Sequence, residues 1–583
     1  MPSRKQCGAW GWMLGTALLV GCGPEEDKLQ LEFIQPEELT ATNRELAVAV
    51  KLLGGPPDRV ALYVDDTWLA NLDASSYVVD TRAWSEGEHL LTARATLGTE
   101  VFTSKGRKVV VDRTPPQVVS VSPAPGATNI PVDAPLSIVF SEPLAPSSLR
   151  SIELEVRGGE GTETLEPLEL SADGKTLVFA KPSRPLAPPR TVSTLLVGEV
   201  RDLVGNTLVP ARDSGWSWHV PEFLSLGNAM EGLAPSARPF VHWLTLRLDA
   251  QGKPMVAWMA SARSVQVRRW ESGSQWTSLP SGPPLEVGTT SHIELDAQGR
   301  PTVTWVQEGS ASSWASVYRL DGGTWKNLAS LGPDATGSFP RIERAVGRVT
   351  SSGVVKLAWQ AQPRTFPGTS EVMVASQSSA TSWGRMSPST SALGWRGLVM
   401  EVDALSEDTV TAWCESVNGG TRVGVQRWKE SQAPVSMPLP TRPGSVFNPA
   451  LVVQRSGNPV VAWSETGAIQ VHRWTGTAWE QLGQPLPTSP TFPEQPETTL
   501  PVLALDGSGQ LLVAWGRPGM AELWQWTESG WRRLGVISRP SLQTDLPGPL
   551  SLQVDAAGVP VLAWSRQATN SALGLVEVFR LNR

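Results

Sequence analysis

The sequence predicts an all-β protein in which two β-sandwiches are followed by a seven-bladed β-propeller. Three observations predict this fold. Short runs of alternating apolar and polar residues, separated by turn residues, fill the first part of the chain. Beyond residue 240 a phrase that ends in Trp recurs at intervals of about 50 residues, the length of one four-stranded blade. The chain also has 26 Trp but only 11 Phe and 3 Tyr, as expected when one local pattern is copied many times.

The N-terminal residues have the features of an export signal. A short positive region is followed by an apolar run over 10–20, which is shorter than the about 20 residues that span a bilayer and is typical of a secretory signal peptide. The ending Leu-Val-Gly-Cys at 19–22 resembles the bacterial lipobox. This resemblance implies a lipoprotein signal peptide over 1–21 and a lipid on Cys22. An ordinary cleaved signal that contains a Cys is the alternative.

The resemblance also predicts a location. Residues 22–30 form a short polar tether, and Gly23 stands where the family's inner-membrane retention signal would be an Asp. We therefore expect an exported chain that is anchored by lipid to the cell envelope, in the outer membrane.

Two sandwiches follow the tether. The pattern over 31–113 contains short strands, and its phrases at 63–66, 79–81 and 87–89 resemble bacterial Ig-like domains. A proline pair at 115–116 marks the next boundary.

Phrases over 114–220 resemble the bacterial Ig-like domain of the SbsA type, first known from surface-layer proteins. The phrases are Ile-Val-Phe-Ser-Glu-Pro-Leu at 138–144, Asp-Gly-Lys-Thr-Leu at 173–177 and Val-Arg-Asp-Leu-Val-Gly-Asn at 200–206. The resemblance implies a spacer or adhesion module. Asp202 and Asn206 could be calcium ligands, but the pattern favours a turn held by side-chain-to-backbone hydrogen bonds.

The repeated phrase occupies 221–583. It contains an Asp-x-x-Gly turn, often a Pro, and then an apolar strand that ends in Trp. We expect each Trp to fill the gap between adjacent blades. The seven copies end at Trp258, Trp305, Trp359, Trp413, Trp463, Trp515 and Trp564. The last copy lacks a fourth strand, and a strand near 222–228 matches the missing phrase. We therefore expect this segment to close the ring.

No catalytic motif is present. The sequence contains no Gly-x-Ser-x-Gly, phosphate-binding loop or His-Glu-x-x-His, and its Cys and His residues lack zinc spacing. We therefore predict no catalytic residue, no cofactor and no metal. Cys414 follows an apolar strand and is expected to be buried and inert.

Charged residues follow the Trp-ending strands, in loops that a propeller gathers on one face. They are a candidate ligand-binding rim: Arg263, Glu308, Arg364, Glu415, Glu465, Arg517 and Arg566. A glycosidase would need two carboxylates from this set, which holds Glu308, Glu415 and Glu465. A solvated rim inherited by repetition is the simpler interpretation.

These features favour a non-enzymatic lipoprotein at the cell surface, in which Ig-like spacers present the propeller for binding or adhesion. A carbohydrate-directed propeller, either a lectin or a glycoside-cleaving enzyme with its site on the channel face, is the alternative. A purely structural envelope protein is a third. The formal net charge of −7 argues against nucleic acid. We expect a monomer that meets the membrane through its lipid and binds an unknown protein or glycan.

Overall fold

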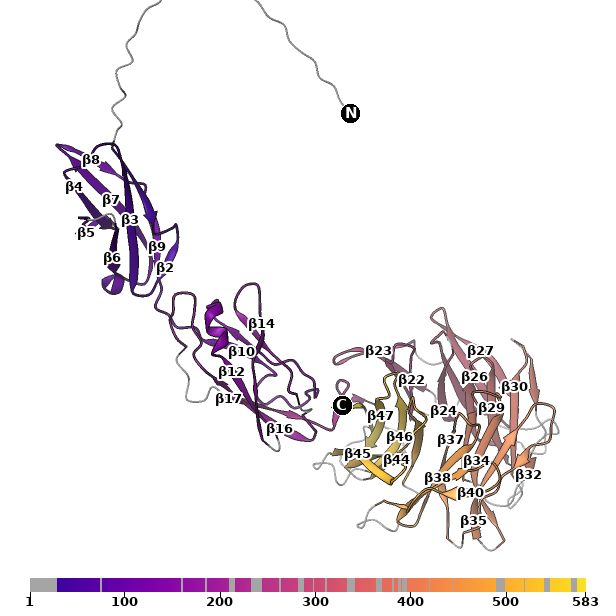
Figure 1. Ribbon diagram of the computed structural model, residues 1–583. Coiled ribbons are helices and arrows are strands. Elements are labelled where there is room, and N and C mark those ends of the chain that lie inside the picture. Colours follow the sequence, from indigo (N-terminus) through magenta and orange to yellow (C-terminus); the bar gives the residue numbers. More distant parts are fainter. Residues whose placement is uncertain are drawn as a thin grey trace, which may run out of the picture. The chain divides into compact units, whose positions relative to one another are not determined.

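The computed structural model describes residues 29–583 with gaps. The gaps are 74–75, 159–160, 184–185, 209–214, 232–243, 262–263, 281–287, 297, 310–311, 333–340, 363–369, 380–381, 386–388, 391–395, 419, 443, 489–498, 518, 539–545 and 568–573. The described residues form 48 strands and two 3-10 helices (Figure 1). None of their helices is long and apolar enough to cross a membrane. The signal peptide and Cys22 lie outside the described residues.

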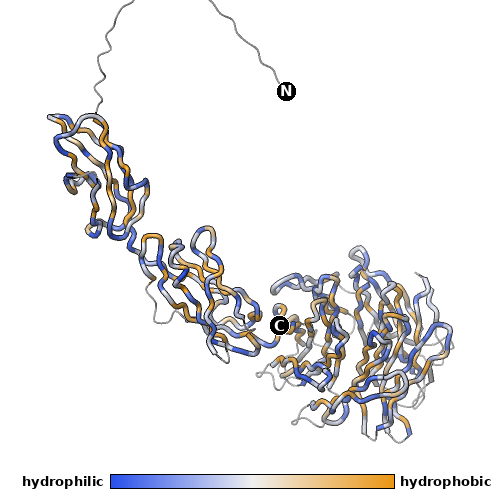
Figure 2. Tube along the Cα trace, viewed as in Figure 1, coloured by the Kyte–Doolittle hydropathy of each residue, from blue (hydrophilic) through white to orange (hydrophobic). Residues whose placement is uncertain are grey.

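The chain divides into two units. The first contains 1–126, 135–183 and 193–217, and the second contains 127–134, 184–192 and 218–583. Each unit is all-β, with hydrophobic residues along its strands and hydrophilic residues at many of its turns (Figure 2).

The first unit begins with two sheets. One has the order β1 (Gln30–Gln35), β3 (Glu45–Leu53) and β6 (Ser76–Asp80). The other has the order β2 (Thr40–Thr42), β9 (Arg107–Val111), β7 (Gly87–Leu97), β4 (Arg59–Val64) and β5 (Thr67–Asn71), and β8 (Glu100–Thr103) pairs with β7. The 3-10 helix η1 (Thr81–Ala83) follows β6.

Alternation along these strands places one face of each sheet in a shared core, which contains Leu46, Val48, Leu62 and Leu91. Leu29 already packs into this core. The first sandwich thus includes the last two residues that the sequence pattern assigns to the tether.

Two four-stranded sheets come next. One has the order β10 (Val118–Ser122), β11 (Ser137–Phe140), β15 (Thr176–Phe179) and β14 (Pro167–Leu170). The other has the order β13 (Thr162–Leu165), β12 (Glu153–Arg157), β16 (Arg190–Val197) and β17 (Gly215–Val220), and η2 (Pro146–Arg150) follows β11. Phe140, Leu154 and Leu177 are each 1 % exposed or less, so an apolar core lies beneath both sheets.

Seven antiparallel sheets make up the described part of the second unit from β18 onward. The first three are β20 (Leu244–Leu248), β21 (Pro254–Ser261), β22 (Ser264–Ser272) and β23 (Gln275–Ser278); β24 (Gly288–Leu295), β25 (Pro301–Glu308), β26 (Ser313–Asp321) and β27 (Thr324–Leu331); and β28 (Arg341–Val349), β29 (Val355–Gln362), β30 (Glu371–Gln377) and β31 (Trp383–Arg385), with β32 (Ser389–Thr390) beside β30.

The fourth to sixth sheets continue the series. They are β33 (Arg396–Val402), β34 (Thr409–Val417), β35 (Gly420–Trp428) and β36 (Val435–Ser436); β37 (Phe447–Val453), β38 (Pro459–Glu465), β39 (Ala468–Trp474) and β40 (Trp479–Gln481), with β41 (Leu486–Pro487) beside β39; and β42 (Val502–Leu505), β43 (Leu511–Arg517), β44 (Met520–Thr527) and β45 (Gly530–Ser538).

The seventh sheet joins both ends of this region. Its strands β46 (Leu546–Val554), β47 (Pro560–Gln567) and β48 (Gly574–Leu581) come from the C-terminus. Its fourth strand is β18 (Phe223–Ser225), which pairs antiparallel with β48 so that Phe223 lies opposite Leu581, and β19 (Met230–Glu231) also pairs with β48. The sequence predicts this pairing, because the segment near 222–228 matches the fourth strand that the last copy lacks.

The first strands of the sheets contact one another in sequence, from β20 through β24, β28, β33, β37 and β42 to β46, and β46 contacts β20. Figure 1 shows the yellow C-terminal sheet beside the sheet of β20–β23.

Each repeated Trp packs against the sheet before its own. Trp305 clusters with Met255 and Val267 of the preceding sheet, and Trp258 of the first sheet clusters with Val561 and Val578 of the seventh. All seven indole side chains are 2 % exposed or less. The expected role of the Trp as the filling between neighbouring sheets is therefore confirmed.

The first sandwich contains a histidine clamp. The His89 ring is buried, its Nδ1 lies 2.6 Å from Asp65 Oδ2, and its Nε2 lies 2.8 Å from the carbonyl oxygen of Ser85. Both ring nitrogens thus face acceptors, which favours the imidazolium. Although burial opposes it, the hydrogen bonds to Asp65 and Ser85 raise the pKa of His89.

This pairing predicts a pH-dependent first sandwich. A raised histidine pKa stabilises the fold below about pH 6.5, the unfolded value, and the contribution is lost as the pH rises through the folded pKa. We expect peptides from 59–97 to resist urea-dependent proteolysis better at pH 6 than at pH 9, and His89→Gln to remove most of this difference. His219→Gln, outside this sandwich, is the control. Equal pH dependence in wild type and His89→Gln would contradict the assignment.

Candidate ligand-binding site

A cavity of about 320 Å³ lies among the first strands of the second unit. All seven sheets contribute to its wall, through side chains that include Arg247, His292, Arg348, Glu401, Ala450, Val502 and Leu550. The wall has two chemically different parts. The first four sheets supply charged and polar groups, whereas the last three supply mainly Leu, Val, Ala and Pro.

Ion pairs link the first four sheets in series. Arg247 of β20 pairs with Glu294 of β24, Glu294 Oε1 lies 2.9 Å from Arg348 Nη1 of β28, and Arg348 Nη2 lies 2.7 Å from Glu401 Oε1 of β33. The side chains of Arg247, Glu294 and Arg348 are only 12–15 % exposed. Because one carboxylate serves two guanidinium groups here, each member of the chain depends on its neighbours.

The titration of these groups reflects their environment. Burial, followed by the positive charge of Arg348, lowers the pKa of His292 to about 3, so this imidazole is neutral at physiological pH. Burial would raise the pKa of Glu294, but Arg247 and Arg348 hold it well below its usual range. Arg344 adds a third guanidinium to the wall, and burial lowers its pKa to about 10. Glu294 is therefore held as a carboxylate between Arg247 and Arg348, next to the neutral His292 imidazole.

The structure accounts for part of the predicted rim. Arg263 and Arg364 lie outside the described residues, and Glu308 and Arg566 are described only as backbone at the ends of β25 and β47. The described side chains are those of Glu415, Glu465 and Arg517. None of these three lines the cavity among the first strands.

Two of these side chains are used within their own sheets. Glu415 is 4 % exposed and accepts a 2.5 Å hydrogen bond from Arg422 Nε, so it differs from the solvated rim residue that the pattern predicts. Arg517 Nη2 lies 2.6 Å from Glu522 Oε1. Cys414 is 4 % exposed, and burial followed by the charge of Glu415 raises the pKa of its thiol, as expected of an inert Cys.

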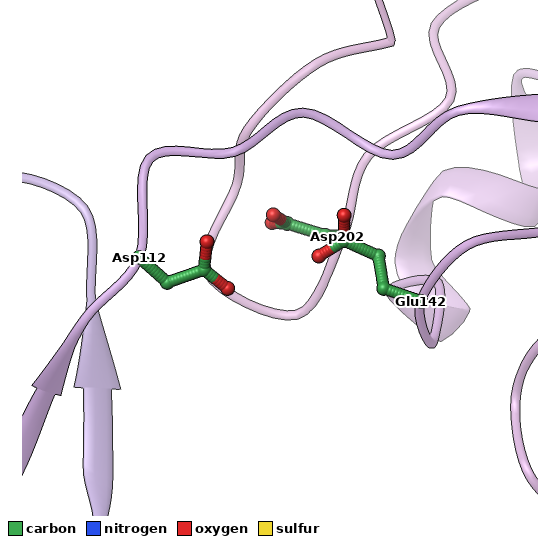
Figure 3. A group of neighbouring side chains, drawn as sticks. All are labelled: Asp112, Glu142 and Asp202. Carbon is green, nitrogen blue, oxygen red and sulfur yellow. The ribbon is translucent and has the colours of Figure 1, made fainter. Parts of the chain in front are cut away.

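A separate acidic cluster lies in the first unit. Asp112, Glu142 and Asp202 each bring a carboxylate oxygen within 4.8 Å of the others (Figure 3). Burial, followed by the charges of Asp112 and Asp202, raises the pKa of Glu142. These three groups could together hold a cation, but acidic side chains also meet in proteins without one, so the cluster alone assigns no metal.

Asp202 in this cluster forms the predicted turn. Its Oδ1 accepts hydrogen bonds from the backbone N–H groups of Val204 at 2.9 Å, Gly205 at 2.7 Å and Asn206 at 2.8 Å. The turn interpretation of Asp202 and Asn206 is therefore confirmed.

The sequence pattern missed the chain from Arg247 to Glu401. A signal for it does exist, because each member stands two residues before the first residue of the turn that ends its strand. Those turn residues are Asp249, Asp296, Thr350 and Asp403. Aligning the seven copies at this turn would have revealed Arg, Glu, Arg and Glu in successive copies.

Residues 112–220 match the family model of the bacterial Ig-like domain, and this segment is an Ig-like domain. No curated protein matches the chain. Among solved structures, the chain is similar to the polysaccharide lyase Uly1, with 11 % identity, 60 % of this chain and 92 % of that chain covered, and a TM-score of 0.41.

Two further structures show weaker likeness. A mutant of the Aleuria aurantia lectin in complex with alpha-methyl-L-fucoside has 13 % identity, covers 51 % of this chain and 94 % of its own, and has a TM-score of 0.35. The Trypanosoma rangeli sialidase has 12 % identity, covers 53 % and 56 %, and has a TM-score of 0.34. Likeness at this level carries no conclusion about ligand or reaction.

The ion-pair chain predicts a strong effect of a single substitution. Glu294→Gln would leave Arg247 and Arg348 without their shared carboxylate in a largely buried place, and we expect it to reduce the free energy of unfolding by about 3–5 kcal/mol. Glu480→Gln, which removes the exposed partner of Arg473, is the matched control and should cost about 0–1 kcal/mol. Urea unfolding of the second unit measures both, and equal losses would contradict a special role for Glu294.

Proposed function

We propose that this chain is a binding protein whose seven sheets are the blades of a closed seven-bladed β-propeller, and that the cavity among the first strands takes up a carbohydrate. The closed ring is supported by the contact of β46 with β20 and by the packing of Trp258 on the seventh sheet. In such a ring the cavity is the central channel.

The proposal of a carbohydrate ligand rests on one observation, namely that one side of the cavity wall is charged and the other is apolar. A sugar ring has hydroxyl groups at its edge and apolar C–H groups on its faces. The charged wall offers guanidinium donors and the Glu401 carboxylate, while Val502 and Leu550 lie in the apolar wall. Arg247, Arg344 and Arg348 bring three guanidinium groups to this wall, and guanidinium groups pair well with carboxylates, which favours an acidic sugar.

Binding is a better account than catalysis. A glycosidase needs two carboxylates with room for substrate between them. Of the three candidate carboxylates, Glu415 is buried against Arg422. Glu401 of the charged wall and Glu294, which shares Arg348 with it, are both held in ion pairs with arginines.

The rest of the chain fits presentation of the propeller at a surface. We propose that the lipid on Cys22 anchors the protein to the outer membrane and that the Ig-like domains act as spacers between the anchor and the propeller. The complete proposal is therefore that the chain is a surface-anchored, non-enzymatic protein that binds glycans and serves adhesion.

The channel assignment predicts selective glycan binding. On a glycan array we expect the full chain to bind oligosaccharides that contain uronic or sialic acids. Arg344→Gln should weaken this binding about tenfold or more, because it removes a charge-assisted hydrogen bond. Arg473→Gln, at an exposed ion pair, is the control. Absence of any glycan ligand would contradict the ligand class, and unchanged binding by Arg344→Gln would contradict its location.

Lipidation predicts a change of compartment. When the full chain is expressed in a Gram-negative host, we expect wild type in the membrane pellet and Cys22→Ser in the soluble fraction, because the thiol that carries the lipid is missing. Mass spectrometry of the N-terminal peptide supplies the direct test. A mature peptide without acyl groups would rule out the anchor.

A further inference from the structure

Two neighbouring sheets carry the same short motif, Trp-x-Glu, at the end of their second strand. It is Trp413 and Glu415 on β34, and Trp463 and Glu465 on β38. Side chains two positions apart on a strand point to the same face, so each Glu stands beside its Trp. Both tryptophans are 2 % exposed or less. The two copies allow a direct internal comparison.

In the copy on β34, the polar groups of Trp and Glu find their hydrogen-bond partners within their own sheet. Trp413 Nε1 donates a 2.8 Å hydrogen bond to Glu415 Oε2, and Arg422 donates a 2.5 Å hydrogen bond to Glu415 Oε1. Arg422 lies directly opposite Glu415 in the strand register. Both carboxylate oxygens of Glu415 thus accept a hydrogen bond from within the protein.

The copy on β38 is not satisfied in this way. Ala468 lies opposite Glu465, so the cation of the other copy is missing. Trp463 Nε1 and Glu465 Oε2 are both shielded from solvent, and neither has a hydrogen-bond partner among the described residues. The indole nitrogens of Trp258, Trp305, Trp515 and Trp564 also lack a partner among the described residues, so the Glu465 carboxylate is what distinguishes this copy. An unsatisfied buried polar group costs about 1–3 kcal/mol, so this carboxylate calls for a partner beyond the described residues.

Two more unsatisfied nitrogens lie at the same place. The Arg442 guanidinium lies over the Trp463 ring at 5.9 Å from its centroid, and the His472 ring stacks on Trp463 at 4.7 Å. Arg442 Nε and His472 Nδ1 also have no hydrogen-bond partner among the described residues. Arg442 belongs to the segment after β36, where its backbone bonds to Thr421, so the group lies at the junction of the fourth and fifth sheets.

The junction can be reached from solvent. Arg442 and Glu465 are partly exposed, and Gly444 beside them is exposed. A Cβ at Gly444 would lie 3.9 Å from Glu465 Oε1, so the space next to the carboxylate is open.

We propose that Arg442, Trp463, Glu465 and His472 form a second binding site, which takes two neighbouring hydroxyl groups of a neutral sugar. A hydroxyl can donate to a carboxylate and accept from an indole or guanidinium N–H at the same time. One anion and one cation leave the site without net charge, so a charged ligand has no advantage. The site takes its ligand class from the proposed function, but it shares no residue with the central cavity.

Calorimetry with the full chain tests the site. The probes are the methyl glycosides of glucose, galactose and mannose, with glucuronic acid as the charged comparison. We expect at least one neutral glycoside to bind, and Glu465→Gln or Trp463→Phe to weaken its binding about tenfold or more. Gly444→Val should weaken it by filling the space beside Glu465, without removing a polar group.

Two controls separate this site from the channel. Glu480→Gln changes an exposed carboxylate on the same sheet and should leave binding of the neutral glycoside unchanged. Arg344→Gln should also leave it unchanged, even where it abolishes binding of acidic oligosaccharides. Loss of acidic binding alone therefore reports on the channel, and loss of neutral binding alone reports on the junction.

The indole N–H gives a second readout. In a spectrum of ¹⁵N-labelled protein, the resonance that disappears in Trp463→Phe should shift when the neutral glycoside is added. Neutral glycosides that bind Glu465→Gln and Gly444→Val as tightly as wild type would overturn the proposal. The same holds if none of the probes binds and water alone bridges Trp463 and Glu465 in a crystal structure.

Discussion

The burial of one indole between each pair of neighbouring sheets is the interaction on which the second unit depends. A Trp side chain buries about 200 Å² of surface, worth on the order of 5 kcal/mol at about 25 cal/mol per Å². Each of the seven indoles needs the preceding sheet as its partner. For Trp258 that partner is the seventh sheet, at the far end of the chain. The first sheet is therefore fully packed only when the last one has formed, and the last one needs β18 to supply its fourth strand.

This dependence explains how the seventh sheet is completed. β18 pairs with β48, and Trp276 of the first sheet donates a 2.7 Å hydrogen bond to the carbonyl oxygen of Leu226, just after β18. Trp531 makes the equivalent bond to Leu482 in the preceding sheet. The strand pairing and the indole hydrogen bond found between other neighbouring sheets are thus also present between the seventh sheet and the first, where the two ends of this region meet. The linkage covers the long edge of β48, which would otherwise be open to pairing with other chains, and leaves the short strand β18 outermost.

In the second unit, the sequence predicted the features that repeat from sheet to sheet and missed the ion pairs that do not. The turn from Asp249 to Gly252 recurs in most copies, and Gly252 has the positive φ of 75° that the turn requires. The pairing of β18 could be predicted because its phrase matched a strand missing elsewhere. The chain from Arg247 to Glu401 becomes visible in the sequence only when the copies are aligned at their turns, since its members are single residues about 50 positions apart. Only the register between successive sheets makes neighbours of them.

Repetition also indicates where function can arise. A duplicated sheet keeps the packed core of its original, so changes at buried apolar positions are costly, whereas polar positions at the junctions between sheets can diverge. Glu415 and Glu465 occupy the same position, but only Glu415 faces an Arg across its strand pair. Once Ala468 stands in place of that Arg, the buried polar atoms of Trp463 and Glu465 have no hydrogen-bond partner among the residues that the structure describes. Natural proteins satisfy nearly all such groups. The indole nitrogens of Trp258, Trp305, Trp515 and Trp564 also lack a partner among the described residues, so the indole alone does not single out this junction. The carboxylate does, because Glu415 at the same position is satisfied by Arg422, and Glu465 is therefore better explained by a partner from solution than by packing.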